Sequence, residues 1–157
     1  MKINKSVEQG AYVILMLAFQ QDHKPVKSSV LSKILKVSDS YLKKILRKLV
    51  VADLIISNAS KDGGFQLIKQ LDEITVYDVY HALEAQDTSF KFSKLAYQIF
   101  EDEEKILNCE KKVVNVFHNA SNAFENELKK VKLSDLISNK DNYTKGFIEW
   151  NKRISSK

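Results

Sequence analysis

The order of short sequence patterns between residues 6 and 68 constrains the fold of this chain more than any other feature. Apolar residues recur at helical spacing in successive stretches at 6–19, 28–35 and 38–49. Two short apolar runs follow, at 54–57 and 65–68. They flank Asp62-Gly63-Gly64, which favours a tight hairpin because glycine adopts positive φ without strain. The pattern predicts a helix-turn-helix followed by a two-stranded wing.

The scarcity of turn residues supports a mainly helical chain. Its 157 residues include four Gly and one Pro, fewer than a many-stranded sandwich or barrel needs. No apolar run approaches the roughly 20 residues that span a bilayer. The basic start at residues 1–5 and the apolar run at 11–19 lack the cleavage site of a signal peptide. We therefore expect a cytoplasmic protein that has no membrane partner.

A long apolar stripe lies in the second half of the chain. Between residues 106 and 131, apolar residues recur at steps of three and four, over about seven helical turns. A helix of this length in a small chain usually buries its stripe against a partner, and a second copy of the stripe would fit. Packing against its own chain is the alternative. The predicted dimer-interface residues are Ile106, Val113, Phe117, Ala120, Phe124 and Leu128.

Positive charge is concentrated at the N-terminal end of the chain. Residues 1–70 hold 12 Lys and Arg against 5 Asp and Glu, whereas residues 71–157 hold 13 against 15. Such asymmetry favours a polyanion partner for the first half, although a solvated lysine-rich surface is the alternative. We expect the polyanion to be double-stranded DNA, because the second helix of a helix-turn-helix enters the major groove.

The candidate DNA-contacting residues follow from this expected geometry. Ser38 caps the second helix of the motif, and Ser40 and Tyr41 open it. Cationic side chains on its polar face reach phosphates or guanine edges, unless that face is only solvated. The start of the preceding helix favours a phosphate, and the turn of the wing carries one cation. The full set is Lys27, Ser28, Ser38, Ser40, Tyr41, Lys43, Lys44, Arg47 and Lys61.

The residues that usually carry catalysis or bind metals are sparse. One cysteine excludes a disulfide framework and any all-cysteine metal site within one chain. The histidines at 23, 81 and 118 have no metal-ligand spacing, and no phosphate loop or nucleophile elbow occurs. We therefore expect no enzyme, no cofactor and no metal. Cys109 is either a small packed hydrophobe or a thiol sensor.

Several motifs in this order resemble the Rrf-two family of bacterial winged helix-turn-helix transcriptional regulators, of the IscR, NsrR and CymR type. The resemblance covers roughly residues 1–137. It rests on Ser40-Tyr41-Leu42, Gly63-Gly64-Phe65, Ile74-Thr75-Val76 with Asp78-Val79, and Leu133-Ser134-Asp135-Leu136-Ile137. It implies a homodimer with a long dimerisation helix that binds a palindromic operator.

The chain departs from this family in two places. Cluster-binding members carry three cysteines between the wing and the long helix, whereas Cys109 is the only cysteine here. This difference argues against an iron–sulfur cluster. Members commonly have an arginine just before the wing glycines, whereas residues 58–62 contain Lys61 as their only cation. The departure puts minor-groove reading by an arginine in doubt.

These observations lead to one interpretation and one alternative. We expect a mainly α fold with a small β-hairpin wing, arranged as a DNA-binding domain (1–84), a dimerisation and sensor region (85–137) and a C-terminal tail (138–157). The expected function is a homodimeric transcriptional regulator, a repressor by family analogy. A small-molecule or oxidant effector is left open. The alternative is a winged-helix protein-interaction module that no longer binds DNA.

Overall fold

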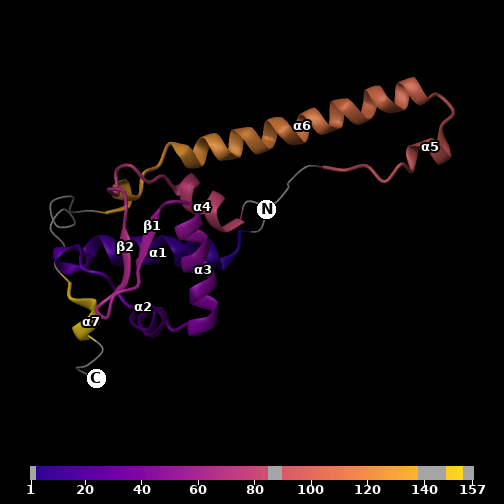
Figure 1. Ribbon diagram of the computed structural model, residues 1–157. Coiled ribbons are helices and arrows are strands. Elements are labelled where there is room, and N and C mark those ends of the chain that lie inside the picture. Colours follow the sequence, from indigo (N-terminus) through magenta and orange to yellow (C-terminus); the bar gives the residue numbers. More distant parts are fainter. Residues whose placement is uncertain (1–2, 85–89, 138–147, 154–157) are drawn as a thin grey trace. The chain divides into compact units, whose positions relative to one another are not determined.

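The computed structural model describes residues 3–84, 90–137 and 148–153. These residues form the mainly helical fold with one two-stranded antiparallel hairpin that the sequence predicts. The chain divides into two compact units, which are described separately. Unit 1 is Met1–Ala85 with Lys129–Lys157, and unit 2 is Gln86–Leu128 (Figure 1).

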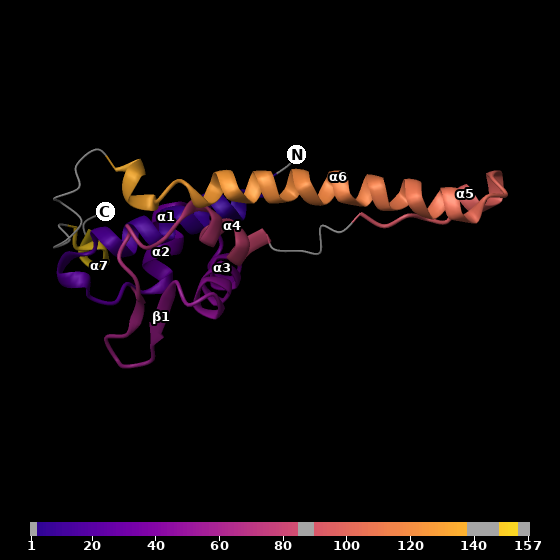
Figure 2. The same cartoon turned by 90° about the horizontal axis from the view of Figure 1, so that it is seen from above.

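Unit 1 contains the winged helix-turn-helix. Its elements in chain order are α1 (Lys5–Phe19), the 3-10 turn η1 (Gln21–His23), α2 (Ser28–Leu35), α3 (Asp39–Val51), β1 (Ile55–Asn58), β2 (Gly64–Leu67), α4 (Val76–Glu84), η2 (Leu133–Leu136) and α7 (Trp150–Arg153). In Figure 2 the hairpin projects from the helices. Its position therefore matches the wing that the sequence predicts.

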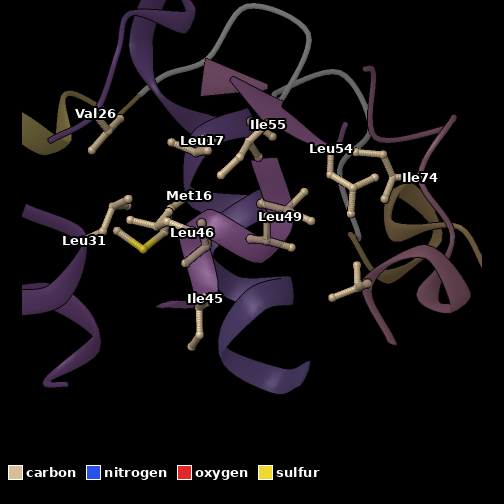
Figure 3. Packing of buried hydrophobic residues seen from close by; sticks show 14 of the residues in the cluster. Met16, Leu17, Val26, Leu31, Ile45, Leu46, Leu49, Leu54, Ile55 and Ile74 are labelled. Atoms are coloured by element: carbon tan, nitrogen blue, oxygen red, sulfur yellow. The ribbon is translucent and has the colours of Figure 1, made fainter. Parts of the chain in front are cut away.

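The core of unit 1 forms where the apolar faces of α1, α2 and α3 meet the hairpin. Ile14 of α1, Leu46 of α3 and Ile55 of β1 are each fully shielded from solvent. Figure 3 shows Leu17, Leu31, Leu46 and Ile55 among the side chains that converge there. Burying each large aliphatic side chain contributes about 1.5–3 kcal/mol. This shared core fixes α3 and the wing relative to each other.

A tight turn joins α2 to α3. Lys36 ends α2 in the left-handed conformation (φ 54°), and its N–H donates to the Ser32 and Lys33 carbonyls. The chain then enters α3 through Ser38, whose Oγ accepts a hydrogen bond from the Tyr41 N–H at 3.3 Å. The expected capping role of Ser38 is confirmed. The cap fixes the start of the helix that carries most of the predicted DNA contacts.

The wing is tied to the segment that precedes α2. Strands β1 and β2 pair antiparallel with Ile55 opposite Leu67 and Asn58 opposite Gly64. Val26 and Phe65 exchange both backbone hydrogen bonds, at 3.0 and 2.9 Å. A Cβ on Gly64 would lie 2.4 Å from the Val26 carbonyl oxygen, so this close approach requires glycine.

Helix α4 begins with a reciprocal cap, as the spacing of Thr75 and Asp78 predicts. The Asp78 carboxylate accepts the Thr75 N–H at 2.7 Å, and Thr75 Oγ1 accepts the Asp78 N–H at 3.2 Å. After the long helix, the Leu133 N–H donates to the Ile74 carbonyl at 2.8 Å. This bond joins η2 to the start of α4 within unit 1.

Unit 2 holds α5 (Ala96–Ile99) and most of the long helix α6 (Glu103–Lys129). The predicted long helix is therefore present. Asp102 begins it: its carboxylate accepts the Lys105 N–H at 3.0 Å and pairs with the Lys105 Nζ at 2.9 Å. These two interactions hold the pKa of Asp102 below its ordinary value. The Phe90 and Phe117 rings stack with centroids 4.5 Å apart.

Residues 148–153 pack against α1 within unit 1, which the sequence did not predict. Residues 148–153, called the C-terminal clasp below, lie against the end of α1. Trp150 is 7% exposed, and its Nε1 donates to the Met16 carbonyl at 2.7 Å. Gln20 is fully buried, and its Oε1 accepts the Trp150 N–H at 3.1 Å. Part of the expected tail is therefore a packed element.

Candidate nucleic-acid interface

Helix α3 has one apolar and one cationic face, as the sequence predicts. Leu42, Ile45, Leu46 and Leu49 are buried in unit 1. The opposite face is exposed and carries Ser40, Tyr41, Lys43, Lys44 and Arg47. The structure therefore brings these candidate residues together on one accessible surface. Their roles in DNA contact remain predictions.

The cations on this face of α3 differ in how they are held. Lys43 pairs with Asp39 one turn earlier, at 2.7 Å between Nζ and Oδ2. Lys48 donates from Nζ to the Leu83 carbonyl of α4 at 2.9 Å, which fixes it at the end of α4. Lys44 and Arg47 have no hydrogen bond or ion pair with the described residues. These two are therefore the least constrained of the four cations.

An open hollow of about 610 Å³ adjoins the C-terminal half of α3. Lys44, Arg47 and Lys48 line it together with Val51 and His81. Three cations around one hollow make this surface attractive to anions. The sequence did not indicate that His81 belongs to this surface, because the packing of α4 against α3 is what brings His81 close to Lys44 and Arg47.

The remaining candidate residues lie around α3 within the same unit. Lys61 is exposed in the turn of the hairpin, where the Gly63 N–H donates to the Ser60 carbonyl at 2.8 Å. Lys27 precedes α2 and is exposed, and Ser28 is its first residue. Neither serine at the start of α2 caps it. In Figure 1, α2, the first turn of α3 and the turn of the hairpin lie toward one edge of unit 1.

The predicted interface stripe lies on α6 with differing exposure. Ile106 is 5% exposed within unit 2, whereas Val113 is 38% and Phe117 50% exposed. Ala120 is exposed, and Phe124 and Leu128 are half-buried. Within α6, a fully described helix, Ile106 is the one buried residue. Most of the helix surface is therefore accessible in the single chain.

Comparison with known proteins identifies the family. The Rrf2 (Rrf-two) family model, described as an iron-dependent transcriptional regulator, matches residues 3–139. The chain belongs to the Rrf2 family. It is a transcriptional regulator with the winged-helix fold of DNA-binding regulators.

Relatives of this Rrf2 chain carry the same assignment. YffB of Lactococcus lactis, provisionally named an HTH-type transcriptional regulator, is 34% identical over 153 residues, 96% of this chain and 97% of YffB. YwgB of Bacillus subtilis, named in the same way, is 40% identical over 103 residues, 66% of each chain. The structure of CymR, the global cysteine regulator of B. subtilis, matches with a TM-score of 0.59 at 23% identity. That match covers 87% of this chain and 95% of CymR, and it concerns the fold.

The iron dependence in the family description does not fit the residues of this chain. A cysteine-ligated iron–sulfur cluster needs several thiolates, and Cys109 is the only cysteine. In the part of the chain that the structure describes, no three His, Cys, Asp or Glu side chains are grouped to hold a metal ion. The Rrf2 chain therefore lacks the usual ligand set of a cluster.

None of its described helices is long and apolar enough to cross a membrane.

Cys109 lines an open hollow of about 720 Å³ in unit 2. The hollow is lined by Phe92, Phe100, Ile106, Glu110 and Val113 among others, and the Cys109 side chain is exposed. The buried Oε1 of Glu110 has no hydrogen-bond partner among the described residues. Burial, and then the carboxylates of Glu110 and Glu103, raise the pKa of Tyr97. The thiol is therefore accessible beside an apolar surface with an acidic rim.

Proposed function

We propose that this Rrf2-family chain is a homodimeric transcriptional repressor that binds a palindromic operator through α3 and the wing. The observation that carries the proposal is the cationic face of α3, on which Lys44 and Arg47 are exposed. A helix-turn-helix uses this face for base edges and phosphates. Repression, rather than activation, rests on analogy with the family.

The composition of the α3 face favours DNA over a protein partner. A protein-docking surface needs exposed apolar anchors near its centre. The first three turns of α3 expose Tyr41 as their one large apolar side chain, at 38%. The other exposed side chains of these turns include Lys43, Lys44 and Arg47. This balance of charge suits a phosphate backbone, so the protein-interaction module is the weaker candidate.

The proposed dimer rests on the exposed apolar surface of α6. Val113, Val116 and Phe117 are 38%, 66% and 50% exposed on the single chain. A monomeric protein rarely leaves so much apolar surface on one helix without a partner. Because Ile106 is already buried in unit 2, the contacts with a second copy involve the middle and end of the stripe more than its beginning.

We further propose that unit 2 receives the regulatory signal. Cys109 offers an exposed thiol, and the hollow beside it offers an apolar surface for a small molecule. Modification of the thiol and binding of a small molecule in the hollow would both act within unit 2, which also carries the proposed interface residues of α6. A change there would alter the dimer and so the spacing of its two recognition helices.

The experiment that tests the proposal selects bound fragments from genomic DNA with the purified protein, with and without oxidant. We expect enrichment of a palindromic sequence and a steep loss of binding to it as salt rises. Salt-independent or absent binding to every duplex would favour the protein-interaction module instead. A reporter gene placed behind the selected operator then distinguishes repression from activation.

A further inference from the structure

The C-terminal clasp is fixed to unit 1 by a dense set of hydrogen bonds. The Ile148 N–H donates to the Phe19 carbonyl at 3.0 Å, and the Gln21 N–H donates to the Ile148 carbonyl at 2.8 Å. Gln20 Nε2 donates to the Glu149 Oε1 at 3.0 Å, and the neighbouring Trp150 side chain is buried. The clasp is therefore an ordered part of unit 1.

The clasp also reaches the segment that leads into α2. Asn151 Nδ2 donates to the Pro25 carbonyl at 3.0 Å, and its Oδ1 accepts the Lys27 N–H at 3.3 Å. Lys27 is the residue before α2 and a candidate DNA contact. Because the carboxamide of Asn151 bridges this segment, Lys152 and Arg153 are placed close to the start of the helix-turn-helix.

Positive charge predominates where the clasp and this segment meet. Residues 22–27 and 148–153 contain four cations and two carboxylates. Asp22 pairs with Lys24 at 3.3 Å, and the Glu149 Oε1 accepts hydrogen bonds from Gln20 and Asn151. Lys27, Lys152 and Arg153 are exposed. The net charge of these two segments is therefore positive.

The Arg153 guanidinium lies over the buried Trp150 ring. The guanidinium is 5.2 Å from the centroid of this ring, which the hydrogen bond to Met16 anchors. A stacked guanidinium keeps its donors available for a phosphate and loses less freedom on binding. In Figure 1, α7 lies toward the same edge of unit 1 as α2 and the turn of the hairpin.

We propose that the C-terminal clasp extends the DNA-binding surface, with Lys152 and Arg153 contacting backbone phosphates beside those contacted at the start of α2. The inference rests on the proposed DNA-binding function and adds a contact that the helix-turn-helix and wing do not include. Asn151 and Trp150 are positioning residues, since they hold the two cations without touching the DNA.

The test compares the salt dependence of DNA binding between wild-type protein and the Lys152→Gln/Arg153→Gln variant. The probe is a labelled duplex of mixed sequence, because phosphate contacts do not depend on sequence. Each lost phosphate contact reduces the slope of log K against log salt by about 0.9, so the double variant should lose about twice that. The charge-preserving variant Lys152→Arg/Arg153→Lys should keep the wild-type slope.

The matched control removes two exposed charges elsewhere, in Lys111→Gln/Lys112→Gln of α6. It should leave the slope unchanged. A wild-type slope in Lys152→Gln/Arg153→Gln would overturn the inference while leaving the proposed function intact. An equal loss of slope in the charge-preserving variant would also overturn it, since the clasp would then act by packing alone. Absence of DNA binding by wild-type protein would overturn both proposals.

Discussion

At the scale of single residues, substitutions of Lys44 and Arg47 test the proposal that α3 reads DNA. Both are exposed beside the hollow at the end of the helix. If either contacts only phosphate, replacing it with alanine should weaken binding to all sequences and reduce the salt slope by about one unit. If it contacts a base, discrimination at one position should relax by about 1–3 kcal/mol. Fluorescence anisotropy across a salt series measures both quantities.

Lys112→Ala serves as the control for these two variants, because it removes an exposed charge from a different helix. Its affinity and salt slope should match those of the wild type. If Lys44→Ala and Arg47→Ala also bind with unchanged affinity at moderate salt, α3 is not the reading helix.

Cys109 is the residue on which a thiol response would depend. Its side chain is exposed at the hollow of unit 2, where oxidation or capping by a small thiol would add bulk and polarity. We expect peroxide or diamide to release the wild-type protein from DNA and to leave Cys109→Ser bound. Equal release of both proteins would exclude the thiol and leave the adjacent hollow, or another site, as the sensor.

At the scale of elements, the attachment of the wing depends on Gly64. A methyl group there would meet the Val26 carbonyl oxygen at 2.4 Å and force β2 away from the segment before α2. We expect Gly64→Ala to weaken the paired bonds between Val26 and Phe65 and to lower the free energy of unfolding by about 1–3 kcal/mol. Urea denaturation measures the change.

The control for this variant is Ser57→Ala, which changes an exposed residue of β1 opposite Phe65. Its unfolding free energy should lie within about 0.5 kcal/mol of wild type, as for most surface substitutions. If Gly64→Ala unfolds with the same free energy as the wild type, β2 can move away from Val26 without loss of stability. The attachment of the wing would then not depend on glycine at this position.

The elements of unit 1 were largely predictable because their determinants are local. The Ser38 side chain accepts the N–H of Tyr41, three residues later, at the start of α3. Thr75 and Asp78 cap α4 at the same spacing. Asp62-Gly63-Gly64 sets the hairpin turn between adjacent strands. In each case the interacting groups are near neighbours in the chain, so periodicity and turn chemistry suffice.

The clasp was not predictable from the same reasoning. The Trp150 indole and the Met16 carbonyl that accepts its hydrogen bond are 134 positions apart. Gln20 is polar, and its complete burial follows from the partners that the clasp supplies. Local spacing carries no information about such a pairing. The only local signal was the presence of four apolar residues in an otherwise polar stretch, Tyr143, Phe147, Ile148 and Trp150.

At the scale of the whole molecule, the proposed function assigns DNA recognition to unit 1 and dimerisation to unit 2. Unit 1 holds the helix-turn-helix, wing and clasp, and unit 2 holds most of α6 and the hollow at Cys109. Recognition of a palindrome requires two copies of unit 1 at a fixed spacing, because each binds one half-site. In the proposed dimer, the contact on α6 would therefore determine operator affinity without α6 itself contacting DNA.

Phe117→Asp tests this dependence at the centre of the stripe. Phe117 is half-exposed and stacks on Phe90, so its free face is available to a second copy. Burial of each large apolar side chain in the dimer contributes about 1.5–3 kcal/mol, and a carboxylate at that position would oppose it. We expect monomer or unfolded protein in sedimentation and loss of operator binding.

Two further variants separate the dimer contact from the internal stack of unit 2. Asn115→Asp adds the same charge to an exposed position on a different face of α6, and it should remain dimeric. Phe117→Leu loses the aromatic stack on Phe90 but stays apolar, so it should also remain dimeric and bind the operator. If Phe117→Asp sediments as a folded dimer, the interface lies elsewhere on the chain. Loss of the dimer in Phe117→Leu as well would trace the effect to the ring stack that supports unit 2, because this variant adds no charge.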